Sequence, residues 1–350
     1  QTASAGTVAL AVRLSTAYFG DIEYTTALNL SQTPSGWAVE WTPEAIHPEL
    51  RNGREFRSII QRPIRGRILG RNGDVLAATV DLRFVGLNRS LVKDQAALKA
   101  ALVEFGFTEA QVDAAFGSAA GQSQRVRVGE IPAEKSEAST ALRAIPGVVL
   151  YFESQRVHPL GAAAAHVVGY TRELTTEELA AKRGSGVRIG DRVGATGLEA
   201  SQEKTLAGTI GAELRLIETS GEVAQVVKNQ AFVQGADVQT TLDADALRTA
   251  YARLGTRSGA AVVIDPVTNG ILALNSSPSF DPDAFERNDG AALAAITAAP
   301  GGPLANRATT GLYSAGSTFK LVTGAAGLLY GGYKVTDRLE CGSIWTGVDP

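Results

Sequence analysis

The chain has 350 residues, of which 44% are hydrophobic and 20% charged, a composition typical of a folded protein with two or three domains. Its net charge of −3 provides no overall positive field for nucleic acid. Cys341 is the only cysteine, which excludes a disulfide framework and a cysteine-based zinc site.

Three segments at the start of the chain alternate apolar and polar residues. Apolar side chains recur at every second position in 8–14, 22–30 and 37–41, with short turns between the runs. This period of two predicts an antiparallel meander with one buried face. We expect Trp37 and Trp41, which share one face of the third strand, to belong to the core.

The middle of the chain mixes strand and helix patterns. The run Arg71-Asn72-Gly73-Asp74 before an apolar segment predicts a hairpin. A helical pattern covers 94–116, and 148–151 is typical of a strand. Thr175 to Glu178 opens a short helix with an acidic first turn. The next expected elements are a glycine-rich loop, a charged helix and a strand, at 184–197, 199–206 and 214–227.

The last part of the chain begins with a change of pattern near residue 234. A strand at 238–242 and a helix at 243–254 are expected there. The runs 260–264 and 271–274 predict a hairpin in a larger sheet. A loop rich in Ala, Gly and Pro extends to residue 304, and a mostly apolar helix is expected over 317–330.

The spacing Ser-x-x-Lys occurs three times, and it places a hydroxyl and an amine on one helix face. A neutral lysine could accept the serine proton and make the hydroxyl nucleophilic. However, ordinary amino-acid usage alone predicts on the order of one or two matches in a chain of this length. Ser90 with Lys93 precedes a helical pattern, which favours a helix N-cap. Ser201 with Lys204 lies beside Glu199 on a pattern typical of a solvated helix face.

The third pair, Ser317 and Lys320, differs because Lys320 is the only charge from Ser317 to Tyr330. An almost wholly apolar helix is expected to be buried, and a buried ammonium is costly unless it is paired or neutral. A catalytic role would explain it, with the Ser317 backbone N–H as a candidate oxyanion donor at the helix N-terminus. Alternatively, Ser317 caps the helix and Lys320 extends to the surface. The residues alone leave both interpretations open.

Other candidate sites are weaker. His158 and His166 lack a G-x-S-x-G companion, so core or surface positions are favoured. Asp281 and Asp283 flank Pro282 and are expected to shape a loop, because a metal site needs more ligands. The glycines of 184–190 lack the strand-to-helix setting of a nucleotide site. We expect no metal and no cofactor.

Several ordered motifs together resemble class B penicillin-binding proteins. The segment 313–320, Tyr-Ser-Ala-Gly-Ser-Thr-Phe-Lys, is similar to the first active-site motif of penicillin-binding transpeptidases, and 259–282 is similar to the strands that open that domain. Arg65-Gly-Arg-Ile68 and Gly194-Ala-Thr-Gly-Leu-Glu199 resemble the two signatures of the pedestal, or dimerisation, domain. The opening meander resembles the C-terminal half of an NTF2-like domain of the methicillin-resistance type. Departures from the family pattern occur at Gly70, His158 and Ala315.

The resemblance implies an α+β multidomain fold that is truncated at both ends. Its parts are a partial NTF2-like antiparallel sheet (1–56), an elongated mixed α/β pedestal domain (57–235) and the N-terminal part of a transpeptidase domain with a serine β-lactamase-like fold (236–350). The family's Ser-x-Asn and Lys-Thr/Ser-Gly motifs do not follow Lys320 within the chain. We therefore expect the fragment itself to be inactive. The absence of methionine and of a signal-peptide pattern also favours a fragment.

The resemblance also implies a serine D,D-transpeptidase that cross-links peptidoglycan stem peptides, with Ser317 as nucleophile and Lys320 as base. β-Lactams would acylate the same serine. The expected location is the extracytoplasmic face of the bacterial cell membrane, with an anchor outside this chain, beside a glycosyltransferase and divisome or elongasome membrane proteins. No nucleic acid is expected. The alternatives are a class D-like β-lactamase or β-lactam sensor, which also uses Ser-Thr-Phe-Lys, and a non-catalytic scaffold of cell-wall assembly.

Overall fold

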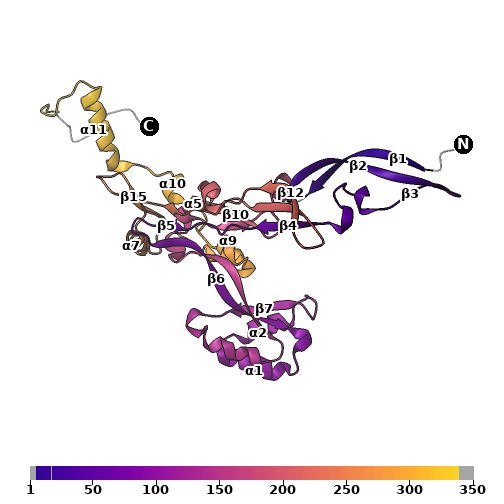
Figure 1. Cartoon of the computed structure of the whole chain (residues 1–350). Helices are drawn as coiled ribbons and strands as arrows, with labels where there is room; N and C mark the ends of the chain where they lie inside the picture. Colours follow the sequence, from indigo (N-terminus) through magenta and orange to yellow (C-terminus); the bar gives the residue numbers. More distant parts are fainter. Residues whose placement is uncertain (1–4, 17, 339–350) are drawn as a thin grey trace. The chain divides into compact units, whose positions relative to one another are not determined.

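The computed structural model describes residues 5–16 and 18–338 of the chain (Figure 1). The chain divides into two compact units, residues 1–308 and 309–350. None of the helices within the described residues is long and apolar enough to cross a membrane.

The N-terminal sheet is an antiparallel meander in the order β1-β2-β3, as the alternating pattern predicted. β1 (Ala5–Thr16) pairs along its length with β2 (Gly20–Thr33), and β3 (Gly36–Val39) pairs with the end of β2. The expected burial of the two tryptophans is wrong, because Trp37 is 53% exposed and Trp41 is 69% exposed. The reason is that no second layer covers their face of the sheet within the described residues.

A second three-stranded sheet has the order β12-β11-β4. β4 (Glu55–Gln61) and β12 (Val223–Gln230) flank β11 (Gly211–Ile217), and both pairings are antiparallel. The sequence pattern over 214–227 predicted one strand, but the structure has a hairpin there. Gly221 adopts a φ of 89° in the turn, a left-handed conformation that glycine adopts easily.

The central sheet is organised around the long strand β6, which belongs to two hydrophobic cores. Its order is β13-β5-β6-β7, and β8 also pairs with β6. Leu76 and Ala77, early in β6, are buried in the first core, whereas Val85 and Leu87, late in β6, are buried in the second. The predicted Asn-Gly hairpin joins β5 and β6. The bounds are β5 (Ile68–Leu69), β6 (Val75–Asn88), β7 (Arg125–Glu130), β8 (Val148–Val157) and β13 (Val238–Gln239).

The second core lies between the late part of β6 and two helices, α1 (Gln95–Phe105) and α2 (Glu109–Phe116) (Figure 1). The sequence predicted one continuous helical segment there. The helix breaks at Gly106, whose φ is 125°, and Thr108 then forms a capping box that starts α2. Leu102 is fully buried in this core.

The first core contains Leu76, Leu206 and Leu247, all fully buried. The predicted helix of 243–254 is α7, which starts after the cap residue Asp243. The predicted hairpin also forms, but β14 and β15 make a two-stranded sheet among the described residues, not part of a larger one. The elements are α3 (Ala165–Val168), α5 (Gly197–Ser201), α6 (Glu203–Ala207), α7 (Ala244–Leu254), β14 (Gly259–Ile264) and β15 (Ile271–Ser277).

Short elements complete the chain. The helix expected after Thr175 is α4, and a capping box between Thr175 and Glu178 starts it. The loop predicted up to residue 304 is partly helical, because Asp289 caps a helix whose run of alanines carries no clear period. The bounds are α4 (Thr176–Ala181), β9 (Thr171–Glu173), β10 (Arg192–Gly194), α8 (Asp283–Glu286), α9 (Gly290–Ala298), α10 (Arg307–Thr310) and α11 (Phe319–Leu329).

Candidate functional site

Ser317 and Lys320 lie at the start of α11. Gly316 has a φ of 53° and begins a tight helical turn, Gly316–Thr318, which continues directly into α11. The Ser317 N–H lies in this first turn, where backbone N–H groups have no partner within the helix. The predicted helix is therefore present, and the three-residue spacing puts the serine and the lysine on one side of its N-terminal end.

The expected burial of this helix is wrong for the described structure. Ser317 and Lys320 are exposed, and α11 has no buried residue. Leu321 is 81% exposed and Leu329 is 73% exposed. The apolar pattern has no covering layer among the described residues, so the helix presents its apolar side chains to solvent.

The N-cap alternative for Ser317 is also wrong. Thr318 occupies the cap position of α11, and Ala315 precedes the turn that contains Ser317; neither makes a side-chain cap hydrogen bond. No hydrogen bond joins the Ser317 hydroxyl to the Lys320 amine within the described part of the chain. Their catalytic role thus stays a prediction, and the hydroxyl and the amine are both exposed.

The other two Ser-x-x-Lys pairs have ordinary surroundings. Ser90 is not the cap of α1, because Asp94 caps that helix by accepting a hydrogen bond from the Ala97 N–H at 2.9 Å. The Ser90 hydroxyl instead donates to Asn88 at 2.7 Å. Ser201 and Lys204 are exposed, as expected for a solvated face.

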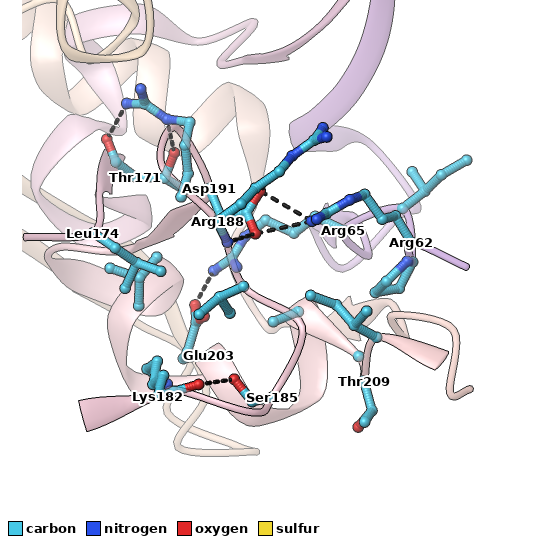
Figure 2. A pocket seen from close by; sticks show the side chains of 18 of the residues that line it. Arg62, Arg65, Thr171, Leu174, Lys182, Ser185, Arg188, Asp191, Glu203 and Thr209 are labelled. Atoms are coloured by element: carbon cyan, nitrogen blue, oxygen red, sulfur yellow. Dashed lines mark hydrogen bonds and ion pairs between the residues drawn. The ribbon is translucent and has the colours of Figure 1, made fainter. Parts of the chain in front are cut away.

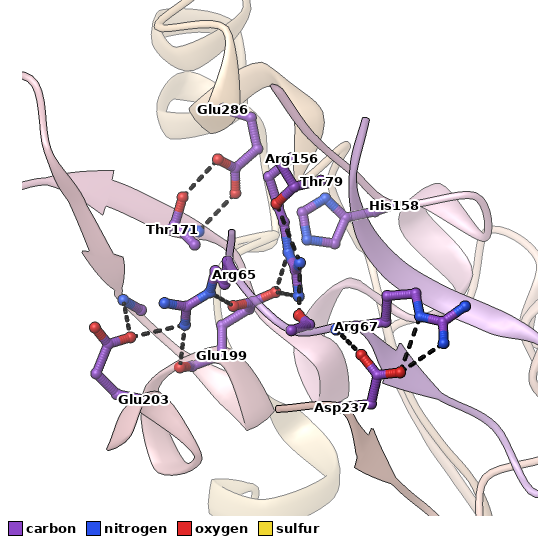
Figure 3. Close-up of polar contacts among 12 residues, drawn as sticks. Arg65, Arg67, Thr79, Arg156, His158, Thr171, Glu199, Glu203, Asp237 and Glu286 are labelled. Atoms are coloured by element: carbon purple, nitrogen blue, oxygen red, sulfur yellow. Dashed lines mark hydrogen bonds and ion pairs between the residues drawn. The ribbon is translucent and has the colours of Figure 1, made fainter. Parts of the chain in front are cut away.

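The two pedestal signatures meet in a buried charge cluster, which consists of Arg65, Arg156 and Glu199 (Figure 3). Glu199 is fully buried, so its expected position on a solvated helix face is wrong. Its carboxylate accepts from Arg65 Nε at 2.6 Å through one oxygen and from Arg156 Nε at 2.7 Å through the other. One carboxylate thus holds two guanidinium groups that are far apart in the sequence, one before β5 and one in β8.

Further contacts engage other donors of the cluster. Arg65 also reaches the Glu203 carboxylate at 2.7 Å, and Arg156 donates to the carbonyl oxygen of Gly66 at 2.8 Å. Burial disfavours the charge of Arg65, but attraction to Glu199 and Glu203 outweighs this and raises its pKa. For Arg156, burial has the larger effect and lowers the pKa, although Glu199 opposes it.

Glycines allow the backbone to approach this cluster closely. A Cβ on Gly194 would overlap the backbone of Glu199, and a Cβ on Gly66 would overlap the backbone of Ala236. Next to Gly66, Asp237 accepts a hydrogen bond from the Arg67 N–H at 2.7 Å and pairs with the Arg67 side chain. The motif residues of both signatures therefore serve packing and charge pairing, a structural role.

Sequence reasoning gave no role to Arg156 or to Glu286. Glu286, at the end of α8, is buried and accepts from the Thr171 N–H and hydroxyl, each at 2.6 Å. Burial raises its pKa, while Thr171 and Arg192 oppose that shift. In the sequence, Arg156 is only a charged residue within an apolar strand pattern, and Glu286 is only a charged residue next to Phe285. These signals are too weak to select either residue.

His158 and His166 are core residues, in agreement with the sequence interpretation that favoured a core or surface position. His158 is buried and donates from Nδ1 to Asp283 at 2.7 Å. His166 is buried and donates from Nε2 to the Pro303 carbonyl at 2.7 Å, and burial lowers its pKa. Among the residues that the structure describes, no group of His, Cys, Asp and Glu is suited to hold a metal ion.

Comparison with known proteins identifies the family of this arrangement. The family model described as the penicillin-binding protein dimerisation domain matches residues 60–240, just over half of the chain. The model described as the penicillin binding protein transpeptidase domain matches residues 259–350. The first match contains the buried charge cluster, and the second contains Ser317 and Lys320.

Individual proteins agree with these matches. Penicillin-binding protein 3 of Bacillus subtilis is 27% identical over 75% of this chain and 39% of its own length. Peptidoglycan D,D-transpeptidase MrdA of Escherichia coli is 30% identical over 77% of this chain and 44% of its own length. The chain thus spans less than half the length of these curated relatives.

A solved structure shares the fold. In the complex between PBP2 and MreC from Helicobacter pylori, the matched chain superposes with a TM-score of 0.55 at 21% identity, over 83% of this chain and 56% of that chain. Together with the family matches, this likeness supports the mixed α/β fold expected from the sequence. The chain belongs to the class B penicillin-binding proteins.

Proposed function

We propose that the protein to which this chain belongs is a peptidoglycan D,D-transpeptidase in which Ser317 is the acyl-accepting nucleophile and Lys320 the base. The observation that carries the proposal is the transpeptidase match over 259–350, which includes a serine and a lysine three residues apart at the start of an apolar helix. The same chemistry is named for the MrdA relatives.

In the proposed reaction, neutral Lys320 accepts the Ser317 hydroxyl proton as Oγ attacks the penultimate D-Ala carbonyl of a stem peptide. The oxyanion that forms would accept a hydrogen bond from the Ser317 N–H in the first turn of the helix. The C–N bond then breaks, and the terminal D-Ala leaves with the proton from Lys320. An amine of a neighbouring stem peptide attacks the ester, which forms the cross-link and restores Ser317.

β-Lactams are proposed to acylate Ser317 by the same first step. The exposed setting of Lys320 within the described residues suggests why the chain alone would react poorly. Desolvation by a covering layer disfavours the charged form of a lysine and so favours the neutral amine that a base requires. We propose that other parts of the parent protein provide that layer.

The cellular setting is also a proposal. The names of the relatives support a cell-wall enzyme at the extracytoplasmic face of the bacterial membrane, and the MreC complex of the PBP2 neighbour supports an elongation partner. We further propose an NTF2-like identity for residues 1–56, a pedestal domain at 57–235 and a transpeptidase part from residue 236. The dimerisation-domain match before the active-site motif supports a transpeptidase over a class D-like β-lactamase or sensor.

The test is labelling of the full-length parent protein with fluorescent penicillin. Ser317→Ala should abolish labelling, whereas Ser90→Ala and Ser201→Ala, which change the matched serines of the other two Ser-x-x-Lys pairs, should leave it unchanged. The 350-residue chain alone should label weakly or not at all. Labelling that survives Ser317→Ala would refute the assignment. Absence of labelling in the wild-type parent would favour the scaffold alternative, and rapid loss of the label by hydrolysis would favour a β-lactamase.

A further inference from the structure

A cleft of about 690 Å³ lies beside the buried charge cluster (Figure 2). Its lining comes from segments that are far apart in the sequence: the residues after β4, the strands β6, β8, β9 and β10, the loop 182–191, α6 with the residues that follow it, and the end of β12. All of them belong to the first compact unit of the chain. The volume lies within the roughly 300–1,000 Å³ of typical ligand sites, yet neither signature of the family resemblance accounts for it.

The lining of this cleft is strongly cationic, although the chain as a whole carries a net charge of −3. Two carboxylates line it, Asp191 and Glu203. Six cationic side chains line it as well: Arg62, Arg65, Arg156, Lys182, Arg188 and Arg192. A concave surface with low-dielectric walls concentrates such a field and attracts ligands of the opposite charge.

Internal ion pairs neutralise only part of this charge. Four carboxylates contact the five arginines among these cations: Asp191, Glu199, Glu203 and Glu286. Six cations against four carboxylates leave an excess of two positive charges. The pairs are concentrated on the four arginines deepest in the fold, so the excess falls on Lys182 and Arg188.

Lys182 and Arg188 lie on the exposed edge of the cleft. Within the described residues Lys182 forms no ion pair. The Arg188 side chain is 63% exposed, and its nearest carboxylate oxygen, on Asp191, is 3.7 Å away. Asp191 is already engaged by Arg62, whose Nη1 donates to both of its oxygens at 2.9 and 3.0 Å. Both outer cations are therefore available to a ligand.

The loop that carries these two cations is held in place before any ligand arrives. Arg62 fixes it through Asp191 and through the Gly186 carbonyl at 3.2 Å. Gly184, Gly186 and Gly190 all have φ between 84° and 89°, and a Cβ on Gly184 would collide with the backbone of Gly20 at the start of β2. The loop expected from these glycines is confirmed. Its packing keeps the cleft in one conformation, and a pre-formed site lowers the entropic cost of binding a ligand.

We propose that this cleft binds an acidic peptide segment of a partner protein. The segment's carboxylates would pair with Lys182 and Arg188, and its backbone would find hydrogen-bonding groups in Thr209, Ser185 and Gln230, which also line the cleft. A single small anion would leave most of the volume unfilled. None of the described lining residues is aromatic, whereas single-stranded nucleic acids stack their bases, and sugars commonly their rings, on aromatic side chains.

The experiment measures binding of a fluorescein-labelled octapeptide of alternating Asp and Glu to the 350-residue chain by fluorescence anisotropy. An octapeptide of alternating Asn and Gln is the neutral probe. The double variant Lys182→Glu with Arg188→Glu removes the outer cations. Its matched control, Arg143→Glu with Lys228→Glu, makes the same change in net charge at two exposed residues outside the cleft. Circular dichroism verifies that both variants fold.

We expect the acidic peptide to bind, the neutral peptide not to bind, and the cleft variant to weaken binding by about tenfold or more, whereas the control variant changes it less than about threefold. Binding should weaken further in about 1 M salt. Equal losses in the two variants, equal binding of the two peptides, or no binding of the acidic peptide would overturn the proposal. Preferential binding of a peptidoglycan-derived disaccharide peptide would overturn it in favour of a glycan site. None of these outcomes depends on acylation of Ser317.

Discussion

The two regions that carry family motifs differ in how completely they satisfy their own interactions. In the pedestal region, the buried Glu199 pairs with Arg65 and with the buried Arg156. At the start of α11, Ser317 and Lys320 are exposed and are not hydrogen-bonded to each other within the described residues. The difference shows that a family signature can mark either a set of residues whose charges are paired within the chain or a reactive group that is still exposed to solvent.

The largest effect is expected from removing the shared carboxylate. Glu199→Ala removes the carboxylate that pairs with the buried Arg156 and one of the two that pair with Arg65, so the free energy of unfolding should fall by about 3–5 kcal/mol. Urea denaturation followed by circular dichroism measures it. Glu55→Ala is the matched control, because Glu55 pairs with Arg57 on the surface with a 61% exposed side chain, and should cost only about 0–1 kcal/mol. An equal loss of unfolding free energy in the two variants would show that the buried charge cluster stabilises the fold no more than a surface ion pair does.

A pair of leucine variants sharpens the contrast between the two regions. Leu102→Ala removes a fully buried side chain of the second core and should cost about 2–5 kcal/mol. Leu321→Ala, in α11, removes a side chain that is 81% exposed and should change stability by less than about 0.5 kcal/mol. Thermal and urea unfolding of the 350-residue chain compares them. A cost of several kcal/mol for Leu321→Ala would mean that α11 packs against other parts of this chain.

Prediction from the sequence succeeded where the pattern is local. The meander at the N-terminus, the Asn72-Gly73 hairpin, and the helices expected at Thr175 and over 243–254 are set by neighbouring residues, and all are confirmed. The family followed from the order of several motifs.

Prediction from the sequence failed where the burial of a residue depends on a partner that is distant in the sequence. The burial of Glu199 depends on Arg65 and Arg156, 134 and 43 positions away. The exposure of Trp37 and of α11 depends on covering layers, which a period of hydrophobic residues cannot reveal. The cationic cleft was missed for the same reason, because its lining residues come from segments that meet only in the fold.

The smallest expected effect on stability comes from a surface charge pair, Arg172 and Glu178. Arg172, through its side-chain hydrogen bonds, lowers the pKa of Glu178 to about 2, and the Thr175 N–H contributes. A carboxylate whose pKa is depressed on folding stabilises the fold above its unfolded pKa, and this contribution is lost as the pH falls through about 2. An NMR titration should find this low pKa in the wild type, and Arg172→Ala should raise it toward the ordinary value. An unchanged pKa in the variant would assign the shift to the capping box alone.

The proposed role of Ser317 is tested most directly by locating the acyl adduct. The full-length parent protein is treated with penicillin, digested with trypsin and analysed by tandem mass spectrometry. Cleavage after Arg307 and Lys320 releases one peptide that contains Ser317. We predict that this peptide gains the mass of penicillin and that its fragment ions place the adduct on Ser317. An adduct on any other residue, for instance on the peptide that contains Ser90, would contradict the account.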